Sequence, residues 1–207
     1  MKEKRWFTVV YMFLVTAFFS SIVIGFSRLT AERVKANEQL NFEKAVLTVL
    51  PGLYDEKLSG LQLHRRFLER VTPPAEETGA AYTLRENGKT IAYALPLAGE
   101  GFWAPIKGVI GIADDLEKII AIAFYEQNET PGLGAQIVTP QFTDQFKHRK
   151  ISPIGKPLTI KRPGETLGPS DVHAVTGATQ TSIRLEKLIN AGLEKWRNRV
   201  TQRSDMQ

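Results

Sequence analysis

The sequence predicts an α+β fold, in which an antiparallel sheet packs against helices that are segregated from the strands along the chain. Residues 81–95 hold two runs of alternating side chains around Asn87-Gly88, a dipeptide typical of the type I′ hairpin turn. Residues 106–126 form a second pair of apolar runs with a turn at Asp114-Asp115, and 157–163 suit a further short strand. Strands and helices do not alternate and no internal repeat is found, which disfavours a parallel α/β sheet.

Apolar residues at helical spacing predict the helices. Residues 31–50 are expected to form one helix, which Pro51-Gly52 ends, and a polar connector follows with a short helix near 62–70. At 139–146, Thr139 is the expected N-cap of a helix that buries two phenylalanines. A closing helix is predicted by one apolar stripe. The stripe consists of Leu185, Leu188, Ile189, Leu193 and Trp196.

The segment 6–27 contains no charged residue and is long enough for a membrane-spanning helix, which needs about 20 residues. A secretory signal peptide is the alternative, but its apolar core is typically about 7–15 residues, whereas the apolar run here is longer and Arg28 follows it without an A-x-A cleavage pattern. Basic residues at 2–5 favour a cytoplasmic N-terminus. We therefore expect a single-pass anchor in the inner (cytoplasmic) membrane, with the soluble domain on the extracytoplasmic (periplasmic) side.

Four regions follow along the chain. They are a membrane anchor at 1–28, a helix and connector at 29–78, a soluble domain at 79–200 and a polar tail at 201–207.

Composition excludes several function classes. The chain has no cysteine, and none of its three histidines lies at metal-ligand spacing from another, so no metal site is expected. The net charge of +5 comes from scattered residues, so nucleic acid is not an expected partner. The phosphate-binding P-loop, the dinucleotide glycine motif and the hydrolase G-x-S-x-G motif are all missing.

Two unusual loops remain as candidates for chemistry. Residues 129–137, ETPGLGAQI, bring exposed backbone close to whatever lies beside them. Residues 175–182, VTGATQTS, place four hydroxyls just before the closing helix, where helix amides favour a phosphate. The alternative for the second loop is that Thr181 or Ser182 simply caps the helix.

Taken together, ETPGLG at 129–134 and TGAT at 176–179 resemble the FMN-binding domain family. The family's best-known members are two flavinylated proteins, the G subunit of the Rnf complex and the C subunit of sodium-translocating NADH:quinone reductase. The resemblance covers about residues 80–195 and extends to the single N-terminal anchor. It implies a membrane-anchored electron carrier with covalent FMN inside a redox-driven ion pump. Its implied partners are other membrane subunits and a flavin transferase.

The resemblance also assigns roles to residues. Thr179 would carry FMN through a phosphoester bond, Gly177 and Ala178 would leave room for the phosphate, and Thr176 matches a position that is Ser or Thr in relatives. The loop that lines the flavin ring would be formed by Glu129, Thr130, Gly132, Leu133 and Gly134. Trp103 either stacks near the flavin or is an ordinary core or lid aromatic. No acid–base catalyst is expected.

Two positions depart from the family pattern. His173 stands where relatives usually have Asp, with Asp171 two residues earlier, and a solvent-facing loop histidine is the plainer interpretation. GFWAPIKG at 101–108 looks closer to the quinone-reductase protein, so the type of complex stays open. The rival functions are a free-standing extracytoplasmic electron carrier and an anchored binding or assembly module without a cofactor.

Overall fold

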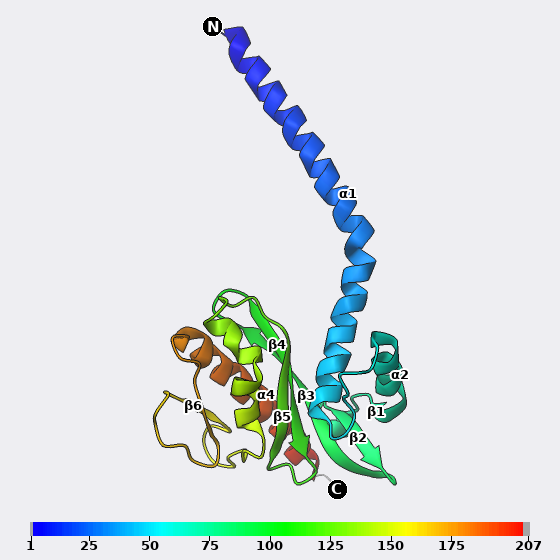
Figure 1. Cartoon of the computed structure of the whole chain (residues 1–207), viewed down its shortest axis with the longest axis vertical. Coiled ribbons are helices and arrows are strands. Elements are labelled where there is room, and N and C mark those ends of the chain that lie inside the picture. Colours follow the sequence, from blue (N-terminus) through cyan, green and yellow to red (C-terminus); the bar gives the residue numbers. More distant parts are fainter. Residues whose placement is uncertain (1, 205–207) are drawn as a thin grey trace. The chain divides into compact units, whose positions relative to one another are not determined.

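The computed structural model describes residues 2–204, and side chains over residues 6–200 (Figure 1). The chain divides into two compact units, Met1–Gln39 and Leu40–Gln207, and each is described by itself. A helix, α1, spans Lys2–Val49, so the helix expected over 31–50 is the C-terminal part of a longer one. The expected end of that helix before Pro51-Gly52 is confirmed.

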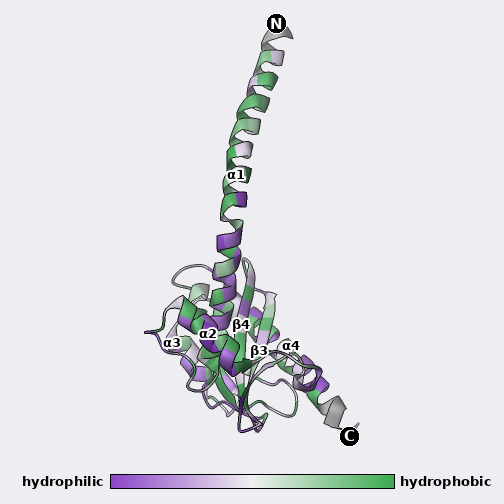
Figure 2. Ribbon diagram, turned by 90° about the vertical axis from the view of Figure 1, so that its right-hand side faces the viewer, coloured by the Kyte–Doolittle hydropathy of each residue, from purple (hydrophilic) through white to green (hydrophobic). Residues whose placement is uncertain are grey.

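The first unit is entirely helical in its described residues. Many large apolar side chains between Trp6 and Leu29 are exposed. In Figure 2 the ribbon of the N-terminal part of α1 is mostly green, the colour of hydrophobic residues. Among the described residues, α1 is the one helix that is long and apolar enough to cross a membrane. A lipid environment would remove this apolar surface from water.

The second unit is built on a five-stranded antiparallel sheet with strand order β1-β2-β3-β4-β5. The strands are β1 (Val71–Thr72), β2 (Tyr82–Glu86), β3 (Lys89–Glu100), β4 (Pro105–Ala113) and β5 (Ile119–Glu126). Asn87 and Gly88 join β2 to β3 with φ angles of 50° and 80°, as a type I′ turn requires. Both predicted strand pairs and the α+β class are thus confirmed.

Helices cover both faces of this sheet (Figure 1). On one face, the apolar stripe of α4 (Thr179–Ser204) packs on Leu95 and Leu97 of β3, and all five predicted stripe residues are buried. On the other face, residues 45–50 and α2 (Gly60–Arg70) pack on Ala92 and Ala94. Successive side chains of β3 point to opposite faces of the sheet, so this strand contributes residues to two hydrophobic cores, one on each face.

Shorter elements complete the unit. They are η1 (Glu76–Thr78), η2 (Gly134–Val138), α3 (Pro140–Thr143), η3 (Asp144–Phe146), β6 (Thr159–Lys161) and β7 (Asp171–His173). The strand expected at 157–163 exists, but it pairs with β7 in a separate parallel sheet, which was not predicted. Thr139 is the N-cap of α3, as expected, but its side chain makes no capping hydrogen bond, because its hydroxyl donates backwards to the carbonyl oxygen of Gln136 at 2.7 Å.

Candidate functional site

The two unusual loops meet in space. Gly177 has a φ of +76°, and a Cβ atom built on it would lie 3.0 Å from Cδ2 of Leu133. Only glycine adopts this backbone conformation readily while leaving space for a neighbouring side chain. Residues that are more than 40 positions apart in the sequence therefore form one site.

A buried carboxylate joins the loops to a third segment. Glu129 is only 5% exposed, and its Oε1 accepts hydrogen bonds from the backbone amides of Phe102 at 2.7 Å and Trp103 at 3.2 Å. Its Oε2 accepts a hydrogen bond of 2.6 Å from the hydroxyl of Thr181 in the first turn of α4. Such charge-assisted bonds are short and strong. Glu129 therefore holds the 101–104 loop, the 129–134 loop and the start of α4 together.

Two glycines make this packing possible. A Cβ atom on Gly134 would lie 2.6 Å from Oγ1 of Thr181 and 2.9 Å from Cβ of Glu129. A Cβ atom on Gly101 would lie 2.5 Å from Oε1 of Glu129. Glu129 and Gly134 were expected along a flavin, but both are buried against protein, whereas Thr130, Gly132 and Leu133 of the same loop are exposed.

An aromatic pair stands beside this loop. Trp103 is 68% exposed and therefore is not a core residue, and its indole Nε1 donates to the hydroxyl of Thr130 at 3.0 Å. The ring of Phe102 packs edge-to-face against Trp103 with the centroids 4.9 Å apart. A hydrogen bond and a ring contact thus fix an exposed indole next to the ETPGLG loop.

Burial separates the four hydroxyls of the second loop into two kinds. Thr176 and Thr179 are exposed, and Thr179 is the first residue of α4. Thr181 and Ser182 are each 4% exposed and lie inside the helix, so the alternative that one of them caps it is wrong. An enzyme could reach only the first two hydroxyls, and Thr179 lies beside the free amides of a helix N-terminus.

A cavity of about 510 Å³ opens between the loops. Gly132 and Thr176 contribute one edge of it, as the two motifs predict. Three amide side chains also line it, and sequence reasoning missed them: Gln136, Gln141 and Gln145. Their four- and five-residue spacing after the glycine loop is the signal that could have revealed them.

His173 forms part of the cavity wall in β7. Its backbone amide donates to Oε1 of Gln145 at 2.8 Å, and its ring Nε2 lies 2.9 Å from the carbonyl oxygen of Glu165. His173 is half-buried on a strand, so the expectation of a solvent-facing loop histidine is wrong. Whatever occupies the cavity would meet an imidazole at this position.

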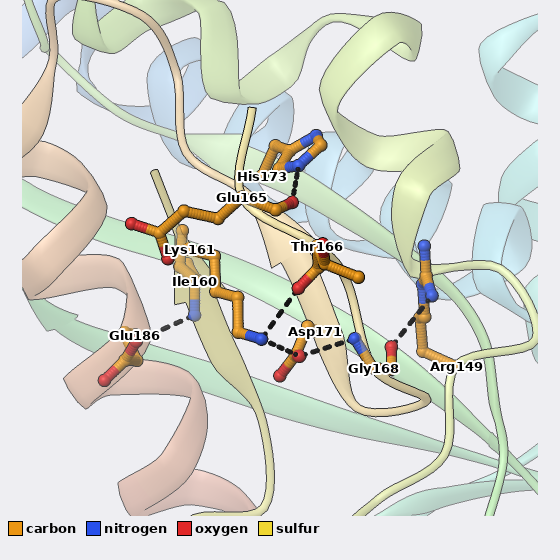
Figure 3. A network of polar contacts seen from close by, with 9 residues as sticks. All are labelled: Arg149, Ile160, Lys161, Glu165, Thr166, Gly168, Asp171, His173 and Glu186. Atoms are coloured by element: carbon orange, nitrogen blue, oxygen red, sulfur yellow. Dashed lines mark hydrogen bonds and ion pairs between the residues drawn. The ribbon is translucent and has the colours of Figure 1, made fainter. Parts of the chain in front are cut away.

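Asp171 has a structural role in the same region (Figure 3). Its Oδ2 lies 2.7 Å from Nζ of Lys161 and accepts a hydrogen bond of 2.6 Å from the amide of Gly168. The hydrogen bond from Lys161 is the main reason why the pKa of Asp171 lies below its usual value. The pair fixes the 162–170 loop, which lies next to His173 on the cavity wall.

Comparisons with known proteins agree with this architecture. Residues 101–194 match the family model described as FMN-binding domain. The chain is 36% identical over 80 residues to the C subunit of the Na(+)-translocating NADH-quinone reductase of Chlamydia pneumoniae, over 39% of this chain and 25% of the relative. This chain thus spans about a quarter of that relative.

A longer match covers most of both chains. The chain is 26% identical over 191 residues to the G subunit of the proton-translocating ferredoxin:NAD(+) oxidoreductase complex of Clostridium ljungdahlii, over 91% of this chain and 90% of the relative. The crystal structure of the C subunit of Na(+)-translocating NADH-quinone reductase from Parabacteroides distasonis superposes with a TM-score of 0.69 at 24% identity. The superposition covers 81% of this chain and 94% of that one. The fold and the two adjoining loops agree with the match of residues 101–194 to the FMN-binding domain family model.

Proposed function

We propose that this protein is a membrane-anchored flavoprotein that relays electrons within an ion-translocating oxidoreductase complex. FMN is joined through its phosphate to the hydroxyl of Thr179. The exposure of Thr179 at the start of α4 carries the proposal, because the neighbouring hydroxyls of Thr181 and Ser182 are buried.

The residues around the cavity fit FMN. The volume of the cavity, about 510 Å³, lies within the range of about 300–1,000 Å³ that is usual for cofactor sites. A Cβ atom on Gly132 would meet no heavy atom within 4 Å, so the backbone is open to a ligand there. Leu133, exposed in the same loop, offers an apolar surface, and the side-chain amides of Gln136 and Gln141 can pair with the carbonyl and N–H groups of a flavin. The Gln145 amide already bonds the backbone of His173 through both its oxygen and its nitrogen.

Residues of both loops would share the binding of the cofactor. Thr130, Gly132 and Leu133 lie along the ring, Thr176 and Gly177 lie next to the phosphate, and Trp103 stands at the open side. Three buried residues support these positions from behind, namely Glu129, Gly134 and Ala178. Bound FMN would supply the redox chemistry, while the chain positions it.

The same function requires a membrane anchor and partner proteins. The apolar part of α1 is the anchor, the domain lies on the extracytoplasmic side, and a flavin transferase forms the ester. Other membrane subunits of the complex are its partners. The match to a protein of such a complex over 90% of that protein's length supports an Rnf-type assembly.

The test is fluorescence in a denaturing gel. The full chain is produced with and without a flavin transferase, and only a covalently bound flavin survives denaturation. We expect a fluorescent band with the transferase and none for Thr179→Ala. Thr176→Ala, which removes the other exposed hydroxyl of the motif, should still acquire the label, and so should Thr166→Ala outside the motif. Fluorescence that persists in Thr179→Ala would contradict the linkage.

A further inference from the structure

A second hollow, of about 400 Å³, lies between the first turns of α4 and the end of β3. It shares no lining residue with the cavity described above. Gln180, which follows Thr179 directly, contributes to its wall. The hollow therefore begins at the proposed attachment point of the cofactor.

Two cations line this hollow and lack ion-pair partners among the described residues. Arg184 and Lys187 are three residues apart on α4, and neither forms a salt bridge in this part of the chain. Nε of Arg184 is buried and has no hydrogen-bond partner among the described residues. Glu100 is the carboxylate in the lining, whereas Glu186 is engaged by Lys156 and the amide of Ile160. Two cations thus face one carboxylate.

Exposed apolar side chains surround these cations. Ile183 is 45% exposed and lines the hollow, and Phe102 is 43% exposed with the guanidinium of Arg184 at 5.9 Å from its ring centroid. Trp103 packs on Phe102 and extends this surface. We call the five residues the α4–β3 face: Phe102, Trp103, Ile183, Arg184 and Lys187. Arginine and aromatic residues side by side are typical of the centres of protein interfaces.

We propose that the α4–β3 face is the docking surface for an acidic electron-carrying protein, an inference that rests on the proposed function. Carboxylates of the partner would pair with Arg184 and Lys187, while its apolar side chains would cover Ile183 and the aromatic pair. A small anion would satisfy the cations but would leave the apolar rim in water.

The position of the face suits electron transfer. At 1.5 Å of rise per residue, Arg184 lies about 7–8 Å along α4 from Thr179. A protein that docks on the face would therefore come close to a cofactor attached at Thr179. Opposite charges would also steer its approach, raising the association rate by about 10-fold or more at low ionic strength.

The test uses the flavin-loaded full chain in detergent and reduced flavodoxin, an acidic protein donor, as the probe. In each encounter one electron passes from reduced flavodoxin to oxidised FMN, and a second encounter completes the two-electron reduction with two protons from solvent. Stopped-flow absorbance measures the rate. We expect the rate to fall with added salt, and to fall about 10-fold in the double variant Arg184→Glu/Lys187→Glu.

Matched controls separate docking from other effects. Lys195→Glu makes the same charge change as Lys187→Glu, at an exposed site further along α4, and should leave the rate within about 2-fold. Lys187→Glu alone changes an exposed residue, should lower the rate by about 3-fold, and carries the test if the double variant does not fold. Reduced riboflavin, a small donor with no phosphate and no protein surface to dock, should reduce wild type and variants at rates within about 2-fold of one another.

The outcomes are distinct. Equal rates with flavodoxin in wild type and both Glu variants would overturn the docking surface, as would an equal loss with reduced riboflavin, which would mean a damaged cofactor site. A protein that acquires no flavin absorbance in the presence of transferase would instead overturn the proposed function.

Discussion

The hydrogen bond between Thr181 and Glu129 offers the sharpest test of how the site is assembled. Thr181→Val keeps the size and β-branching of the side chain but removes the hydroxyl that donates to Oε2 of Glu129 at 2.6 Å. Both residues are buried, so water cannot replace the lost donor. The two amide donors to Oε1 remain, which confines the loss to one oxygen of the carboxylate.

The expected cost follows from this geometry. A hydrogen bond to a buried charged group contributes about 1.5–3 kcal/mol. For a unit of about 170 residues, each kcal/mol lowers the melting temperature by roughly 2–4 °C, so Thr181→Val should lower it by about 3–12 °C. Because the bond holds the first turn of α4, covalent flavin loading at Thr179 should also fall, measured as in-gel fluorescence per protein.

Neighbouring variants serve as controls. Ser182→Ala removes a hydroxyl that is equally buried but has no hydrogen-bond partner among the described residues, so its melting temperature should stay within about 2 °C of wild type. Thr181→Ser keeps the donor and should restore flavin loading. If Thr181→Val melted like wild type, or if Ser182→Ala lost as much stability, the carboxylate would not hold the site together.

Two further predictions concern the rest of the unit. Gly111→Ala should lower the free energy of unfolding by about 1–3 kcal/mol in a urea titration, because its Cβ would lie 2.5 Å from the carbonyl oxygen of Val49; unchanged stability would contradict this packing. Asp171→Asn should lower the melting temperature at pH 7 through loss of the Lys161 pair. Since the folded-state pKa of Asp171 is lowered, that contribution is present above the ordinary carboxyl pKa and disappears as pH falls through the folded-state value. Asp144→Asn, in an exposed pair, should show a smaller effect, and a difference independent of pH would refute the assignment.

Local signals in the sequence were sufficient for much of the fold. Asn87-Gly88 determines its hairpin through backbone conformations that few other dipeptides adopt, and the α4 stripe is buried as its spacing predicts. The parallel pairing of β6 with β7 could not be predicted, because each strand has three residues and their contact depends on the loop that Asp171 and Lys161 fix. No local pattern encodes such a pairing.

In the candidate site, too, some features could be predicted from the sequence and others could not. The two motifs identify exposed residues such as Thr179 and Gly132, because glycine and hydroxyl patterns are visible in the sequence. The role of Glu129 was not visible, since its partners Phe102 and Thr181 are 27 and 52 residues away. A carboxylate beside a glycine loop suggests contact with a ligand, and only the fold shows that it faces inward.

The central claim is that Thr179 carries the cofactor, and mass spectrometry tests it most directly. Trypsin should release residues 162–184, because Pro163 blocks cleavage after Arg162. This peptide contains six hydroxyl residues, so fragment ions must locate the modification. We predict that the full chain, purified from its own membrane, gains the mass of one FMN less one water, located on Thr179. An unmodified peptide, or the added mass on another residue, would contradict the account.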